Sequence, residues 1–295
     1  MLIDLRYHLT SLVAVFLALA LGMLVGSSYI ASSSLSRLEQ EFGSIREENR
    51  QHRKVIEMLR DQLKKHEEFE SCTAPFLVDG LLRFRQVAIV QTGDYGDATQ
   101  RAKAILEKAG AEVVSVTTVF DLSSDSAQRR AARSLEQITG ISGEPDPVGE
   151  VLRILAKCVA VGADSNAVDI LENNGVIAKA GEYNRRVTLV VLVGGCKSPR
   201  SKRSEMIDLP LIDGLVAAGV KTIVGTEPFN VGTSYISIYH RKAISTVDNI
   251  DQYMGQVCLA YAVAGDSGSF GIKRSADKVS PDYLEVWKSR YRAYR

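Results

Sequence analysis

Residues 186–193, with Thr188-Leu-Val-Val-Leu-Val193 at their heart, are the clearest buried strand of the chain. A short apolar run without alternation is typical of a strand that is covered on both faces. Further strands are predicted at 87–90, 112–119 and 221–224, and helices at about 96–109, 125–138, 148–161, 164–173, 209–218 and 249–264. This alternation predicts an α/β domain with a mainly parallel sheet over residues 76–295.

Two loops that follow predicted strands are candidate binding sites. Thr92-Gly-Asp-Tyr-Gly-Asp97 has the position of a phosphate-binding turn, but it lacks the glycine-rich patterns and its two Asp would repel phosphate, so we expect a capped helix start. The loop Gly194–Arg203 follows the clearest strand, at the edge where open α/β sheets bind ligands. Its cations could meet an anion or an acidic partner, or simply be solvated: Lys197, Arg200, Lys202 and Arg203.

Two further segments of the C-terminal region carry weaker signals. Residues 235–239 alternate apolar and polar side chains, which predicts an edge strand. Residues 287–295 mix cations with aromatic side chains, which suits an anionic polymer, a lipid surface or a solvated terminus.

Composition and motifs exclude several classes of protein. The 295 residues carry 36 Lys and Arg against 35 Asp and Glu, so the net charge of +1 predicts no nucleic-acid partner. Four Cys are too few for a disulfide scaffold, and no CxxC pattern or Cys/His spacing identifies a metal site. Because GxSxG and HExxH are also absent from the sequence, we expect no catalytic residues, no cofactor and no enzymatic activity.

The N-terminal region predicts a membrane anchor. From Leu9 to Ile30 the chain has no formal charge, and as a helix this run reaches roughly 33 Å, enough for a hydrocarbon core. A cleaved signal peptide is the alternative, although its apolar region is normally shorter. Residues 1–8 then form a cytoplasmic leader, and we expect the C-terminal domain outside the cytoplasm. Gly22 and Gly26 form a GxxxG pair, which allows two membrane helices to approach closely.

Residues 35–70 predict a parallel coiled coil, roughly 50 Å long. Heptad spacing places mostly apolar side chains at the seam: Leu35, Phe42, Asn49, Ile56 and Leu63 at a, and Leu38, Ile45, His52, Leu59 and His66 at d. Asn49 at a central a position favours two parallel strands in one register. The flanking charges agree, since Glu41 can face Arg46, and Glu48 can face Arg53, across such a dimer. The alternative is one amphipathic helix that packs on its own domain.

Both ends of the chain resemble one known family. The opening Ile3-Asp-Leu-Arg-Tyr-His8 and the run that follows it are similar to the start of the MctB family of copper transporters. The C-terminal motif is also similar, at Ser245–Asp251, Gly255-Gln256, Ala264-Gly265, Gly268–Gly271, Ala276 and Pro281. Within it Asp248, Asp251, Gly255, Gly268, Gly271 and Pro281 match the family pattern. Ser269 departs from it, because many relatives are expected to have His there.

The resemblance implies copper efflux or homeostasis, with a pore in a mycobacterial outer membrane. A bound copper ion is implied by this resemblance only, and the residues identify no metal site. One span cannot by itself enclose a channel. Some relatives, called SteB in corynebacteria, are coiled-coil membrane proteins that act in cell separation with SteA, a thiamine-pyrophosphokinase-like partner. The resemblance therefore also implies an alternative, in which a dimeric, membrane-anchored scaffold binds a protein or a wall polymer.

Overall fold

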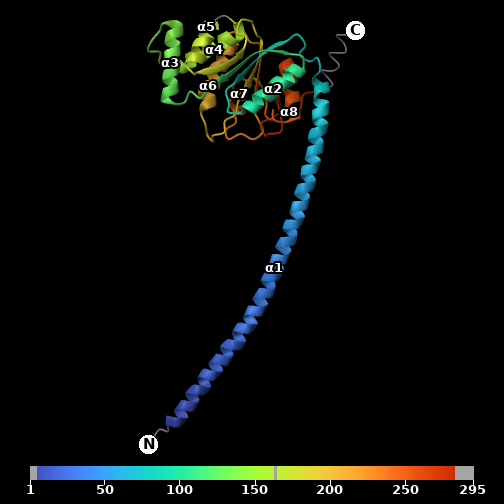
Figure 1. Cartoon of the computed structure of the whole chain (residues 1–295), viewed down its shortest axis with the longest axis vertical. Helices are drawn as coiled ribbons and strands as arrows, with labels where there is room; N and C mark the ends of the chain where they lie inside the picture. The colour runs from blue at the N-terminus through green and yellow to red at the C-terminus, as the bar shows by residue number, and fades with distance from the viewer. Residues whose placement is uncertain (1–4, 163–164, 283–295) are drawn as a thin grey trace. The chain divides into compact units, whose positions relative to one another are not determined.

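The computed structural model describes residues 5–162 and 165–282, and for residues 5, 6 and 27–39 it describes the backbone alone. The chain divides into two compact units, Met1–His66 and Glu67–Arg295 (Figure 1). The predicted leader lies partly outside the described residues, and the basic aromatic segment 287–295 lies wholly outside them.

Helix α1 runs without interruption from Leu5 to Val78. Its stretch Tyr7–Gly26 is long and apolar enough to cross a membrane, and within the described part of the chain this is the one such span. It overlaps the predicted span 9–30. Further along, the apolar seam residues whose side chains are described are exposed, from Phe42 to Leu63. The side chains of Leu35 and Leu38 lie outside the described residues, and the coiled coil stays a prediction because a single chain is described.

The second unit contains a seven-stranded sheet in the order β3-β2-β1-β4-β5-β6-β7. The strands are β1 (Gln86–Gln91), β2 (Glu112–Val119), β3 (Ile177–Gly181), β4 (Leu189–Val193), β5 (Thr222–Thr226), β6 (Ser245–Val247) and β7 (Ser269–Phe270). Every pairing is parallel except that of β3 with β2. The predicted α/β fold with a mainly parallel sheet is therefore confirmed.

Helices cover both faces of the sheet, as the burial of β4 shows. Val190 and Leu192 belong to one core cluster, and Leu189, Val191 and Val193 belong to the other. The first cluster lies under α3 (Asp125–Thr139), α4 (Pro147–Val161), α5 (Ser165–Asn173), α6 (Arg203–Ala217) and α7 (Ile236–Arg241). The second lies under the end of α1, α2 (Gly96–Lys108) and α8 (Tyr253–Ala264) (Figure 1). Because every β4 side chain is buried, the apolar run has no polar alternation.

The predicted edge strand at 235–239 is wrong, since this segment begins α7. Tyr235, Ile236 and Tyr239 are buried together, at the spacing of one helical face. The true neighbour of β5 is the short strand β6, which pairs through Ser245, Thr246 and Val247. A helix of six residues is too short for its period to be told apart from alternation.

Candidate functional site

The candidate site lies where the chain connections leave the sheet in opposite directions. Strand β1 continues into α2 on one face, whereas its neighbour β4 continues into α6 on the other. The carboxyl ends of two such strands form a crevice, which is the usual ligand position in open α/β sheets. The loops at this edge are the two that the sequence singled out, 92–97 and 194–203.

The two loops contact each other directly through their backbones. The amides of Thr92 and Gly93 donate to the carbonyl of Val193 at 2.9 and 3.0 Å, and the amide of Asp94 donates to the carbonyl of Gly195 at 3.0 Å. A Cβ atom at Gly93 would lie 2.3 Å from that same carbonyl oxygen. Only glycine fits this crossing, so the loops hold each other in a fixed position.

Asp94 connects the loops through its side chain. Its carboxylate accepts from Nη1 of Arg203 at 2.6 Å and from the amide of Lys197 at 3.0 Å. Burial alone would raise the pKa of Asp94, but these two donors and the thiol of Cys196 together hold that pKa below its usual value. Asp94 is therefore ionised, and it does not cap α2, so the expected side-chain cap at this helix start is wrong.

The structure separates the four cations of the predicted basic loop. Arg203 is 7% exposed and also donates through Nη2 to the carbonyl of Val119 at 3.0 Å. Lys197, Arg200 and Lys202 stay exposed at the surface. A partner that binds this loop would therefore contact three cations, whereas Arg203 connects the loop to the end of β2.

A buried polar cluster that sequence reasoning missed lies beneath these loops. Asp208 of α6 is fully buried and accepts at 2.8 Å from Thr92 Oγ1 and at 2.8 Å from the hydroxyl of Tyr239. Burial raises the pKa of Asp208 to about 7, against the opposing effect of these two hydrogen bonds. The only sequence signal was an acidic residue on the apolar face of a helix.

The crevice opens into a pocket of about 470 Å³ beside the start of α2. Its polar lining includes Asp94, Asp97, Arg101, Lys197, Asn230 and Asp251. The lining contains three carboxylates and two cations, so the pocket presents both signs of charge. It can bind a polar group by hydrogen bonds and ion pairs, and it lacks the uniform positive charge that a phosphate site provides.

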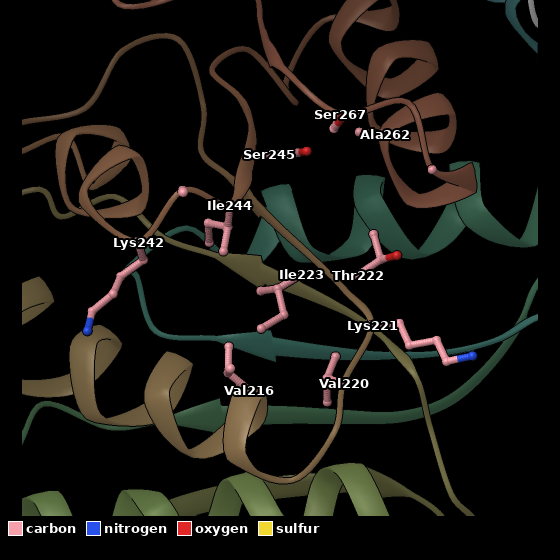
Figure 2. Close-up of a pocket in the computed structure, with 12 residues that line it drawn as sticks. Val216, Val220, Lys221, Thr222, Ile223, Lys242, Ile244, Ser245, Ala262 and Ser267 are labelled. Atoms are coloured by element: carbon pink, nitrogen blue, oxygen red, sulfur yellow. The ribbon is translucent and has the colours of Figure 1, made fainter.

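A second pocket of about 450 Å³ lies at the opposite end of the strands, where β5 and β6 begin. Figure 2 shows Val216, Ile223 and Ile244 gathered around it, with Lys221 and Lys242 on opposite sides. The ammonium group of Lys242 is paired with Asp213 at 2.6 Å. The described lining mixes apolar side chains with lysines and hydroxyl groups and has no carboxylate or imidazole, so we place no chemistry there.

The C-terminal motif residues hold one turn of chain in place. Asp248 is buried and accepts from the amides of Ile272 and Lys273, each at 3.0 Å. A Cβ atom at Gly271 would lie 1.9 Å from Oδ1 of Asp248, so this position requires glycine. Lys273 in turn donates at 2.6 Å to Glu227, a fully buried residue that sequence reasoning missed.

The remaining motif residues have similar structural contacts. Asp251 accepts from the amide of Phe229 at 2.8 Å, and a Cβ atom at Gly255 would lie 2.0 Å from the carbonyl of Asn249. Gly268 has a φ of +159°, and Pro281 is buried. The motif thus stabilises the carboxyl-terminal part of the fold.

Ser269, where a His was expected in many relatives, lies beside a histidine of α7. Its hydroxyl is 2.8 Å from Nε2 of His240 and 2.8 Å from Oγ1 of Thr246. Within residues 5–162 and 165–282 no group of three or more His, Cys, Asp or Glu side chains is placed to hold a metal ion. In this chain the hydroxyl of Ser269 thus takes part in a hydrogen-bonded group with one imidazole.

Comparison with known proteins identifies the family. The model of the family described as "Copper transport outer membrane protein, MctB" matches residues 2–281. The chain belongs to the MctB family. Proteins named "Copper transporter MctB" from Mycobacterium tuberculosis and Mycobacterium bovis are 24% identical to it over 314 residues, covering 95% of this chain and 99% of theirs. The Mycobacterium leprae protein of that name is also 24% identical, over 315 residues. The match spans α1 and the whole sheet, so it covers most of both units of this chain.

Proposed function

We propose that this chain is a membrane-anchored, non-enzymatic component of copper transport or copper homeostasis that acts as a parallel dimer. The observation that carries the proposal is the MctB family match over residues 2–281. The apolar stretch Tyr7–Gly26 supports the anchor. We place the C-terminal unit outside the cytoplasm, where it would meet exported copper.

The exposed seam of α1 supports the dimer. Phe42, Ile45, Ile56, Leu59 and Leu63 are each about half exposed in the single chain. Large apolar side chains repeated at heptad spacing need a partner helix to be buried. A second copy in parallel would supply the same side chains in register, and it would also bring Gly22 and Gly26 of both spans together.

The buried ionisable groups support a non-enzymatic role. Asp208 and Glu227 have no exposed surface, and both accept hydrogen bonds that join segments of the fold. A catalytic acid or base must reach a substrate. Neither carboxyl group has exposed surface at which it could meet a substrate.

The experiment that tests the function compares a deletion strain with the parent strain on rising copper. If the proposal holds, the deletion strain stops growing at lower copper and retains more cell-associated copper, and the full-length gene restores both. The matched control is growth on rising zinc, which should not change. An unchanged copper tolerance would overturn the proposal. Chained cells together with normal copper tolerance would instead favour the scaffold that acts with a SteA-like partner.

A further inference from the structure

Phe84 has a strained backbone conformation in the turn between α1 and β1. The amide of Arg85 closes this turn on the carbonyl of Leu82 at 2.9 Å, and Phe84 is the third of its four residues. The φ of Phe84 is +65°. A positive φ at the third position of a turn favours glycine, and a bulky side chain there costs free energy.

The surroundings of the turn impose this conformation. The amide of Leu82 donates to the carbonyl of Ala109 at 2.8 Å, and the carbonyl of Arg85 accepts from the amide of Glu112 at 2.9 Å. Leu82 is 1% exposed, so its side chain holds the turn in the core. Because the turn is attached at both ends, the strain at Phe84 belongs to the fold.

Packing of the phenyl group does not offset this strain. Phe84 is 93% exposed. A side chain contributes to stability in proportion to the apolar area that folding removes from water, and this ring loses almost none. Glycine at this position would relieve the backbone and remove no core contact. The described fold therefore does not account for phenylalanine here, which points to a contact outside the chain.

Two arginines lie beside the ring, at the end of the sheet where β1 and β4 begin. Phe84, Arg85 and Arg186 line a pocket of about 550 Å³ there, at the opposite end of the strands from the crevice. Val87 pairs with Leu189, so the two arginines precede neighbouring strands. Both arginines are exposed. Among the described residues neither guanidinium group has an ion pair.

The one carboxylate in the described lining of this pocket already has its own donors. Glu112 accepts from Nη1 of Arg185 at 2.6 Å and from Nε2 of Gln86 at 3.0 Å. It therefore does not neutralise Arg85 and Arg186. The pocket presents two unpaired guanidinium groups and a projecting phenyl ring.

We propose that Phe84, Arg85 and Arg186 form a docking site for an acidic segment of a partner protein, with an apolar side chain of that segment against the Phe84 ring. Aromatic residues and arginine are enriched at protein–protein interfaces. Guanidinium groups bind carboxylates through paired hydrogen bonds. A small anion could pair with the arginines, but only a larger partner could also cover the projecting ring. The site goes beyond copper handling and does not depend on it.

Binding of a defined acidic peptide tests the site. The probe is the fluorescein-labelled peptide Glu-Glu-Leu-Glu-Glu-Leu-Glu-Glu, whose fluorescence anisotropy is measured with the full-length protein in phosphatidylcholine nanodiscs. We expect binding that weakens as salt rises. Arg85→Glu should raise the dissociation constant by about tenfold or more. The matched control is Arg133→Glu, which reverses the charge of an exposed arginine on α3 and should leave the dissociation constant nearly unchanged.

Phe84→Gly separates recognition from stability. The thermal midpoint of unfolding should rise by about 2–4 °C, because glycine relieves the positive φ. The dissociation constant for the leucine peptide should rise by about fivefold or more, because the contact with the ring is lost. A peptide with serine in place of leucine should bind the natural chain about as weakly as the leucine peptide binds this variant.

Three results would overturn the proposal. One is equal binding of the leucine and serine peptides to the natural chain, which would show attraction between charges alone. Another is a lower thermal midpoint in Phe84→Gly, which would show that the ring packs within the fold. The third is the absence of peptide binding. If phosphatidylglycerol vesicles then bind the natural chain and not Phe84→Gly, the site belongs to a lipid surface.

Discussion

The guanidinium group of Arg203 donates to Oδ1 of Asp94 at 2.6 Å, which joins the first residue of α6 to the loop after β1. These residues come from the two segments that leave the sheet on opposite faces. Their ion pair therefore adds a side-chain connection between two loops that also contact each other through backbone hydrogen bonds.

Arg203→Met is expected to lower the free energy of unfolding by about 2–3 kcal/mol, because Asp94 then keeps its charge in a partly buried place without its partner. Since the pKa of Asp94 is lowered in the folded chain, this loss is full above the ordinary value of 3.8 and disappears as the pH falls through the folded value. Urea unfolding of the detergent-solubilised chain at several pH values measures this loss in the free energy of unfolding. The exposed Arg200→Met is the control, and an equal loss there would contradict the assignment.

Asp208 should make stability depend on pH near neutrality. Its pKa is about 7 in the folded chain against an ordinary 3.8, so the folded state holds the proton more tightly. The stability that this proton contributes is present below 3.8 and is lost as the pH rises through 7. Asp208→Asn keeps the acceptor oxygen and removes the titration. Relative to the natural chain, the free energy of unfolding of the variant should therefore rise by about several kcal/mol between pH 4 and 8. Urea unfolding of both proteins over this pH range measures the difference, and a difference that stays constant with pH would refute the prediction.

Gly271→Ala should destabilise the chain more than Gly140→Ala. Both glycines have positive φ, of +144° and +74°, so each substitution carries a backbone cost of about 1–2 kcal/mol. At Gly271 the added Cβ also meets the carboxylate of Asp248, whereas nothing lies within 4 Å at Gly140. Thermal unfolding compares the two variants. Equal shifts would show that the Asp248 contact can relax.

Asn49→Cys should form a disulfide between copies when the full-length protein is oxidised in the membrane, because position a faces its symmetry mate in a parallel dimer. Glu47→Cys, at the outward f position of the preceding heptad, is the matched control and should stay reduced. Non-reducing electrophoresis measures both, with Cys72→Ser as the background. Cross-linking at both positions, or at neither, would contradict the predicted seam.

Local sequence patterns were enough to predict a strand or helix where burial follows one regular pattern along the segment. The run 188–193 identifies a central strand because both of its faces are buried, and α3 shows its amphipathic face by period alone. The short elements could not be recognised in this way. Strand β6 has three residues and β7 has two, so their identity comes from the neighbours that they pair with.

The candidate site was predicted only as two loops. The position of the loops could be predicted because each follows a predicted strand. The role of Arg203 could not be predicted, because the sequence does not show which residue pairs with a cation in a basic loop. Asp94 is 109 residues away from it. Asp208 and Glu227 were missed for the same reason, since burial of a carboxyl group depends on segments that are remote in the chain.

By itself, the sequence determined that the chain has an apolar helix long enough for a membrane, a heptad after it and an α/β domain with a mainly parallel sheet, because each follows from periodicity within one segment. Tertiary structure alone decided that β1 and β4 are neighbours and that Arg203 pairs with Asp94. It also decided that Phe69 and Phe76 near the end of α1 are exposed. These contacts and exposures depend on packing between segments that are far apart in the sequence, so no local pattern predicts them.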